Sequence, residues 1–216
     1  IADAFIEKLK SKIQSFYGNN AEAQMASKDF ARIVDEHHWL RLKKLFTQTV
    51  ADTKIKVVCG GQFSESERYI APTVLDHVTA DSPIMSDEIF GPILPIIRYK
   101  NLNEALKFIQ SHPQPLALYV FTENKTEANL VKLQTTSGGF VQNHLIIHLA
   151  NPHAPFGGIG PSGQGCYHGY HGFKEFSHQR TCLKEPSTIS TSQLLFPPYS
   201  RKSLDLILKF MRRFLG

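Results

Sequence analysis

The chain has 216 residues, 42% of them hydrophobic, which is enough for a sizeable core. Its formal charge is +5, but residues 201–216 hold five basic side chains against one aspartate, so the preceding body is nearly neutral. A neutral body argues against a nucleic-acid-binding face. No apolar run is long enough to span a bilayer and no signal peptide is visible. Three irregularly spaced cysteines fit reduced thiols in a cytoplasmic protein: Cys59, Cys166 and Cys182.

The first two periodic segments predict helices. Residues 1–17 repeat apolar groups at helical spacing with lysines between them, and Gly18 is a suitable C-cap. Residues 28–50 show a second helical pattern around Trp39. The chain begins at Ile1, inside the first helical pattern, so we expect it to be part of a longer polypeptide.

Strand and helix patterns then alternate through the middle of the chain. From residue 93 to residue 149 the order is strand, helix, strand, helix, strand, and such connections build parallel sheets. The sequence therefore predicts an α/β fold, a mostly parallel sheet with flanking helices. The expected strands are 54–61, 68–78, 92–100, 116–124 and 139–149, and the expected helices are 101–112 and 125–137, the latter ended by Gly138.

Residues 151–169 contain six glycines and three prolines, so they cannot form a regular element. The segment is not a dinucleotide-binding fingerprint, because no strand–turn–helix unit surrounds it, and it is not a P-loop. Two interpretations remain open. It is either a flexible surface loop or a loop whose backbone passes close to a substrate or to another segment, which glycine permits.

Glu88 lies in the stretch "MSDEIFGPILPI", just before a tight turn that leads into an apolar strand. One interpretation is a solvated turn carboxylate. The other is a ligand-binding group, because a carboxylate can accept two hydrogen bonds from neighbouring hydroxyls such as those of a ribose. Phe90 would then give a flat apolar wall to a ring.

The histidines and cysteines do not predict a further reactive site. The ten histidines show no repeated metal-ligand spacing, so we expect no metal site. Cys166 and His168 are too close in sequence to expect the geometry of a nucleophile and its base.

Five stretches occur in the order and approximate spacing of aldehyde dehydrogenases, and the last one is most similar to the class 3 branch. They are "RYIAPTVL", "MSDEIFGPILPI", "PLALYVFTEN", "SGGFVQNHLIIH" and "PFGGIGPSGQGCYHGYHGFKEFSHQRTCL". The resemblance covers residues 1–186, the C-terminal part of the catalytic domain. Pro161 and Cys166 depart from the polar or small residues that are frequent in the family.

The resemblance implies an NAD- or NADP-dependent enzyme that oxidises medium- or long-chain or aromatic aldehydes to carboxylic acids, as a homodimer. It implies that Glu88 holds the ribose hydroxyls of the nicotinamide half of the cofactor, with Phe90 beside that ribose. It places Asn143, Phe156, Tyr167 and His168 at the substrate pocket.

In this family the nucleophilic cysteine, the general base and the cofactor domain lie upstream of these residues. We therefore expect no catalytic residue in this chain and no activity from the chain alone. The rival interpretation is a non-catalytic fragment or isoform that acts as a dimerisation or membrane-binding module.

Residues 187–216 are predicted to be a linker and a basic amphipathic tail. Within 201–216 one apolar stripe runs at helical spacing, opposite the charged residues, and it comprises Leu204, Ile207, Leu208, Met211 and Leu215. Two interpretations stay open. The tail docks on a partner subunit, or it lies on an anionic membrane surface, which would make a cytoplasmic protein peripheral to a membrane.

Overall fold

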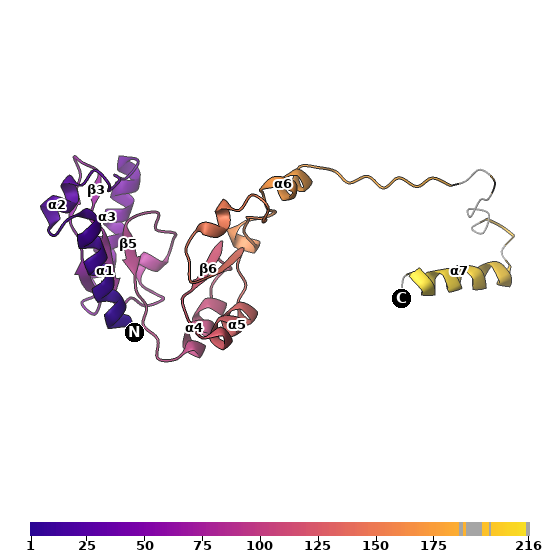
Figure 1. Ribbon diagram of the computed structural model, residues 1–216, viewed down its shortest axis with the longest axis horizontal. Helices are drawn as coiled ribbons and strands as arrows, with labels where there is room; N and C mark the ends of the chain where they lie inside the picture. The colour runs from indigo at the N-terminus through magenta and orange to yellow at the C-terminus, as the bar shows by residue number, and fades with distance from the viewer. Residues whose placement is uncertain (186–187, 189–195, 199, 215–216) are drawn as a thin grey trace. The chain divides into compact units, whose positions relative to one another are not determined.

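The structure is a computed structural model that describes residues 1–185, 188, 196–198 and 200–214. The chain divides into two compact units, an N-terminal unit of Ile1–His112 and a C-terminal unit of Pro113–Gly216 (Figure 1). The predicted boundary between residues 186 and 187 lies outside the described residues, so the division into 1–186 and 187–216 stays a prediction.

Capping residues set the ends of the helices in the N-terminal unit. The first helix ends at Gly18, which has a φ of 121°, as the sequence predicted. The second predicted helix begins at Glu36 rather than at residue 28, because the Asp35 carboxylate accepts a hydrogen bond from the His38 amide and caps it there. The Asn101 side chain caps the next predicted helix by accepting a hydrogen bond from the Glu104 amide. The bounds are α1 (Ala2–Tyr17), α2 (Ala21–Ala26), α3 (Glu36–Val50) and α4 (Leu102–Gln110).

The N-terminal unit contains two small sheets, and their strands are shorter than predicted. In the larger sheet the order is β1-β4-β5, with β1 antiparallel to β4 and β4 parallel to β5. A separate antiparallel pair joins β2 to β3, and Pro72 lies between β3 and β4. The bounds are β1 (Lys56–Cys59), β2 (Phe63–Ser64), β3 (Tyr69–Ile70), β4 (Thr73–Asp76) and β5 (Ile93–Pro95).

The core of this unit forms where α3 packs with the larger sheet and with the short 3-10 helix η1 (Pro83–Met85). Trp39 and Leu42 are almost fully buried, and the indole of Trp39 donates a hydrogen bond to the Tyr69 carbonyl at 3.0 Å. All four residues of β4 are buried, so this strand is covered on both faces. The cluster comprises Ile33, Trp39, Leu42, Leu45, Ile55, Ile70, Leu75, Val78, Ile84 and Ile93.

The C-terminal unit contains the predicted strand–helix–strand connection. β6 (Ala117–Val120) pairs in parallel with β7 (Gly139–Gln142), and α5 (Lys125–Gln134) connects them. The Asn124 side chain caps α5 by accepting hydrogen bonds from two backbone amides. The helix ends before the extended residue Thr135, so the prediction that Gly138 ends it was wrong.

Two further predictions for this region were wrong. The fold is α/β, but the strands of the described residues form three small sheets and not one mostly parallel sheet, because β5 joins β4 while β6 and β7 form their own pair. The predicted strand 139–149 stops at Gln142. Asn143 and Ile146 have φ values of 56° and 65°, which an extended strand does not tolerate, and the 3-10 helix η2 (Ile147–Ala150) follows.

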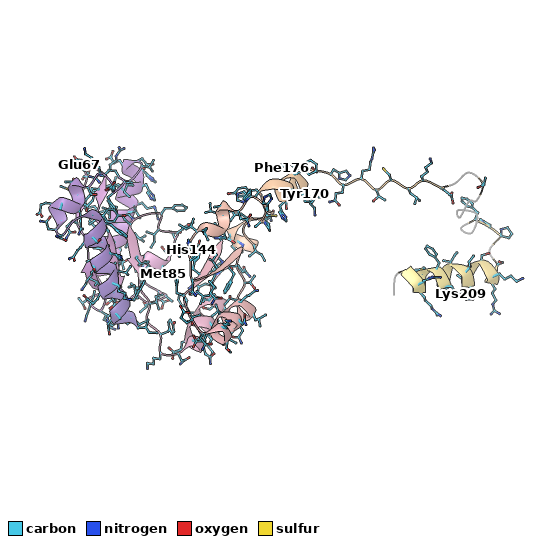
Figure 2. The ribbon with its side chains drawn as sticks, viewed as in Figure 1. Glu67, Met85, His144, Tyr170, Phe176 and Lys209 are labelled. Carbon is cyan, nitrogen blue, oxygen red and sulfur yellow. The ribbon has the colours of Figure 1, made fainter. Side chains whose placement is uncertain are left out.

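The glycine-rich segment contains only one short 3-10 helix, η3 (Gly160–Ser162), in agreement with its prediction as an irregular segment. The unpredicted helix α6 (Gly169–Glu175) follows it. Tyr170 and Phe176 project from α6 and from the residue after it, and both are exposed (Figure 2).

The tail is helical, as predicted, and forms α7 (Arg201–Phe214) (Figure 1). At its N-terminus the Ser200 hydroxyl accepts a hydrogen bond from the Ser203 amide. Leu215, the last member of the predicted apolar stripe, lies outside the described residues. In the described part of the chain, no helix combines the length and the apolar character needed to cross a membrane.

Candidate functional site

The first candidate site is the loop at residues 88–91 of the N-terminal unit. Phe90 adopts a left-handed backbone conformation with a φ of 48°, which costs a residue with a Cβ about 1–2 kcal/mol. Its side chain is 72% exposed. The Glu88 side chain is also exposed, and among the described residues no side chain or backbone group bonds its carboxylate. The loop therefore presents a free carboxylate and an uncovered aromatic ring two residues apart.

Helix α3 holds this loop through the loop's backbone. The Arg41 guanidinium donates from Nη2 to the Glu88 carbonyl at 3.2 Å and to the Ile89 carbonyl at 2.5 Å. The His38 ring nitrogen Nε2 lies 2.7 Å from the Phe90 carbonyl oxygen. Sequence reasoning did not identify His38 or Arg41. Their spacing of three residues on one helix face was visible, but nothing in the sequence connected that face to a loop about fifty residues later.

The second candidate site is a group of aromatic rings in the C-terminal unit. Phe156 and Tyr167 form an antiparallel bridge with backbone hydrogen bonds of 2.9 and 3.1 Å, and their ring centroids are 5.5 Å apart. The His168 ring stacks on Phe156 at 6.1 Å and contacts Tyr167 edge-on at 4.3 Å. The structure thus brings together three of the four residues predicted at the substrate pocket.

His148 extends this ring group on its other side. Its ring lies 5.4 Å from that of Phe156 and 5.9 Å from that of Tyr119. Both of its ring nitrogens are buried without a hydrogen-bond partner among the described residues, as is Nδ1 of His168. Each buried polar atom without a partner lowers the stability of the fold by about 1–3 kcal/mol, so this arrangement is destabilising. Sequence reasoning treated His148 as a strand residue and did not place it in this group.

Glycine allows the backbone around Phe156 to pass close to neighbouring segments. A Cβ on Gly157 would collide with the Gly165 carbonyl oxygen, and one on Gly158 would collide with that of Ser162. These contacts favour the second interpretation of the glycine-rich segment, in which its backbone passes close to another segment.

Asn143, the fourth predicted pocket residue, bonds the end of the neighbouring strand. Its side-chain oxygen accepts from the Thr122 amide at 2.9 Å, and its side-chain nitrogen donates to the Thr122 carbonyl at 3.0 Å. This pair of bonds joins the ends of β6 and β7. In this chain Asn143 thus holds the strand end, and its contact with a substrate stays a prediction.

No other reactive group emerges in the described part of the chain. Cys166 approaches Glu175, at 3.7 Å from Sγ to Oε1, rather than a histidine. The residues that the structure describes contain no group of three or more potential metal ligands.

An ion-pair cluster lies at the end of β4, the central strand of the larger sheet, and stabilises the N-terminal unit. The Arg98 guanidinium donates to both carboxylate oxygens of the buried Asp76, at 2.8 and 2.7 Å, and to Asp3 of α1 at 2.6 Å. The hydrogen bonds from Arg98 lower the pKa of Asp76 below its usual range. Because this cluster ties α1 to the sheet, we assign it a structural role.

Comparison with known sequences gives a consistent match. A profile described as "Aldehyde dehydrogenase family" matches residues 1–182. A Staphylococcus aureus protein named 4,4'-diaponeurosporen-aldehyde dehydrogenase is 43% identical over 202 residues, which are 94% of this chain and 42% of that protein. A Rattus norvegicus protein named "Aldehyde dehydrogenase, dimeric NADP-preferring" is 43% identical over 183 residues, 85% of this chain and 38% of that protein.

Solved structures agree with the sequence comparison. A Staphylococcus aureus structure described as the substrate-bound state of AldH has a TM-score of 0.84 and 40% identity, and the match covers 99% of this chain and 44% of that one. A salicylaldehyde dehydrogenase from Pseudomonas putida has a TM-score of 0.75 and 27% identity, over 87% of this chain and 38% of that one. The chain thus spans about two fifths of the length of the relatives it matches.

Proposed function

Because the chain belongs to the aldehyde dehydrogenase family and resembles class 3 members over most of its length, we propose that it forms part of an NAD(P)-dependent aldehyde dehydrogenase. In this proposal Glu88 binds the ribose hydroxyls of the nicotinamide half of the cofactor, and Phe90 packs beside that ribose. The observation that carries it is the free Glu88 carboxylate next to an exposed Phe90, on a loop whose carbonyls α3 holds.

The residues of the loop fit the group that they would bind. An ionised carboxylate only accepts hydrogen bonds, and its two oxygens match two neighbouring hydroxyl donors. The exposed face of Phe90 offers an apolar surface to a sugar or a ring. When bound, NAD(P)+ supplies the acceptor for the hydride that leaves the aldehyde carbon. The part of this chain is to position the cofactor.

The aldehyde pocket is the second part of the proposal. The ring of Phe156, with Tyr167 and His168 against it, supplies an apolar wall for a medium- or long-chain or aromatic aldehyde, and Asn143 lies near the pocket. The nucleophilic cysteine and the general base come from outside these residues. Support comes from the names of the relatives, one of which is called a family 3 member and another dimeric and NADP-preferring. The same proposal includes that the full-length protein forms a homodimer and that it uses either NAD or NADP as its cofactor.

The test of the cofactor role replaces Glu88 in the full-length protein that carries these residues. Glu88→Gln keeps the shape and removes the charge. We expect at least about tenfold weaker NAD(P)+ binding, since a hydrogen bond to a charged group contributes about 1.5–3 kcal/mol. The measurement is the dissociation constant by fluorescence titration.

Asp87→Asn is the matched control, because Asp87 is the adjacent exposed carboxylate and contacts only the Ser86 hydroxyl among the described hydrogen bonds. Unchanged affinity in Glu88→Gln, or an equal loss in both variants, would show that Glu88 is only a turn residue.

An activity assay distinguishes this proposal from the rival interpretation, in which the chain is a non-catalytic module. The 216-residue chain alone should produce no NAD(P)H from benzaldehyde or hexanal above a heat-killed control, because the nucleophile is supplied elsewhere. Activity that disappears in Cys166→Ala would contradict this account. A full-length protein with no activity, but with a dimer that depends on these residues, would favour the module.

A second candidate function is attachment of α7 to an anionic membrane surface. With helical residues about 100° apart, the charged side chains of Arg201–Arg213 fall within about a third of the helix circumference and the apolar ones on the rest. The apolar side chains are exposed, and they include Leu204, Leu206, Leu208 and Met211. Lys209, labelled on α7 in Figure 2, is one of these charged residues. A helix that lies on a membrane needs this division of faces, whereas cores of protein interfaces are depleted of lysine.

Sedimentation with phosphatidylserine vesicles tests this candidate. We expect the full-length protein to bind at low salt and to be released at high salt, because each basic residue near the surface contributes about 1 kcal/mol. Arg212→Glu with Arg213→Glu should abolish binding, while vesicles of phosphatidylcholine should not bind. If the protein stays in the supernatant and deletion of residues 201–216 dissociates a dimer, the tail contributes to dimerisation and not to membrane binding.

A further inference from the structure

One face of α3 provides hydrogen-bond donors for three successive carbonyl groups. Arg41 bonds the carbonyls of Glu88 and Ile89, and His38 bonds that of Phe90. Both side chains are half-buried, whereas the loop they hold is exposed apart from Ile89. Two polar side chains thus donate hydrogen bonds to the backbone of a surface loop, although water could bond the same carbonyls. These bonds indicate that the chain holds the loop in one defined position.

The two donors also fix each other. A carbonyl oxygen only accepts, so Nε2 of His38 must carry the hydrogen that is donated to the Phe90 oxygen. Nδ1 is then free to accept, and the Arg41 Nε–H lies 3.4 Å from it. Arg41 therefore contacts the loop twice through Nη2 and orients His38 through its Nε–H. Lysine could not reproduce this fork, because an ammonium is a single point of attachment.

Packing adds a third point of attachment. A Cβ on Gly91 would lie 2.6 Å from a methyl carbon of Leu42, so the backbone after Phe90 rests directly on the core side of α3. Leu42 is itself fully buried. The loop is thus held at each of its four residues, from Glu88 to Gly91, while its two outward side chains remain uncovered.

We propose that His38 and Arg41 are positioning residues for the cofactor, which act by fixing the backbone from which Glu88 and Phe90 project. This inference rests on the proposed function. Neither residue needs to touch the cofactor in this role. Arg41 sets the origin of the Glu88 side chain, and His38 keeps Phe90 in the left-handed conformation that turns its ring outward.

The experiment compares Arg41→Met, His38→Ala and Glu88→Gln in the full-length protein, singly and as the Arg41→Met/Glu88→Gln pair. The readouts are the NAD(P)+ dissociation constant, the KM for the aldehyde and the melting temperature. We expect Arg41→Met to weaken cofactor binding about tenfold without a change in aldehyde KM, since a misplacement of about 1 Å can cost as much as about 100-fold. Lys44→Met is the matched control, an exposed lysine of α3 whose loss removes the same charge.

Two comparisons separate positioning from a general structural role. His38→Gln should recover most of the loss seen in His38→Ala, because the glutamine amide can donate to the Phe90 carbonyl, while the melting temperature stays within a few degrees in all variants. Arg41→Met should add little to Glu88→Gln, since Arg41 acts through Glu88 and residues that act as one unit are not additive.

Each outcome decides a different point. Full additivity of Arg41→Met with Glu88→Gln, or unchanged cofactor affinity in Arg41→Met, would overturn the positioning role while leaving the role of Glu88 in place. Unchanged affinity in Glu88→Gln would overturn the cofactor role of Glu88 and the positioning role with it. A loss that parallels the melting temperature in every variant, with no rescue by His38→Gln, would show that the two residues only stabilise the fold.

Discussion

The two compact units differ in how completely they bury their own apolar residues. Among the described residues, fifteen of the seventeen buried hydrophobic side chains lie in the N-terminal unit, and the C-terminal unit contributes only Ala128 and Val131. The C-terminal unit instead exposes Phe121, Leu133 and Ile146, and the sheet formed by its described residues has two strands. A two-stranded sheet is marginally stable without further packing, so this unit needs apolar surface that it does not supply itself.

This difference has a functional consequence. The proposed cofactor contacts, Glu88 and Phe90, belong to the unit with its own core. The proposed pocket residues, such as Phe156 and His168, belong to the unit whose described residues include only two buried hydrophobic side chains. We therefore infer that the cofactor loop is preformed in this chain, whereas the aldehyde pocket depends on additional protein. In the relatives, more than half of the length lies outside the matched region and is available for that purpose.

The largest expected effect comes from matched leucines in the two units. Leu42→Ala removes a fully buried side chain and should lower the free energy of unfolding of the 216-residue chain by about 3 kcal/mol. Leu133→Ala removes a side chain that is 82% exposed and should change it by less than about 0.5 kcal/mol. Urea unfolding measures both effects when it is followed by Trp39 fluorescence, which reports on the N-terminal unit, and by circular dichroism, which reports on both units.

The same two substitutions give a further test in the full-length protein. There Leu133→Ala should lower the free energy of unfolding more than it does in the 216-residue chain if other protein covers this side chain. An equal cost of the two substitutions in the 216-residue chain would show that the units do not differ in this way.

An intermediate effect is expected at the ion-pair cluster of the N-terminal unit. Asp76→Asn should lower the free energy of unfolding at pH 7 by on the order of 2 kcal/mol, because it removes a nearly buried carboxylate bonded twice by Arg98. Since the folded-state pKa of Asp76 is lowered, its contribution is present above the unfolded value of about 3.9 and is lost as the pH falls through the folded value. Urea unfolding across this pH range measures it.

The difference between wild type and Asp76→Asn should therefore shrink towards zero in acid. Asp81→Asn, at an exposed aspartate of the same unit, is the control and should have little effect at any pH. A difference that stays constant down to acid pH would mean that the Asp76→Asn substitution destabilises the unit through packing and not through lost charge.

The smallest expected effect concerns the cysteines of the two units. Burial raises the pKa of the half-buried Cys59 thiol, which reduces its thiolate fraction at pH 8. Cys182 in the C-terminal unit is exposed. Iodoacetamide should therefore label Cys59 several-fold more slowly than Cys182, as followed by mass spectrometry, and the two rates should converge in urea. Equal rates in the native protein would indicate that β1 opens readily.

Local patterns were sufficient to predict most helices. Gly18 and Asn101 marked helix ends because a C-cap glycine and an N-cap asparagine act within one turn. The connection from β6 through α5 to β7 was likewise predictable from alternating patterns. The sheet order was not, because pairing of β4 with β5 and of β6 with β7 depends on contacts that no local pattern specifies.

The candidate site was predictable to a similar extent. The motif around Glu88 and Phe90 identified the outward side chains. The supporting residues His38 and Arg41 act over separations of about fifty residues, so only the structure could show them. The end of β7 was missed because a β-branched residue such as Ile146 seldom adopts a φ of 65°, and its sequence favours a strand.

Hydrogen–deuterium exchange of the 216-residue chain tests the central difference between the units most directly. Amides of α3 and β4 in the N-terminal unit, including that of Thr73, bonded to the Pro92 carbonyl at 2.8 Å, should exchange only through global unfolding. Amides of the β6–β7 pair, including that of Asn143, bonded to the Val120 carbonyl at 2.8 Å, should exchange much faster through local opening. Equal protection of the two sets would contradict the account, because the C-terminal unit would then hold its own fold without additional protein.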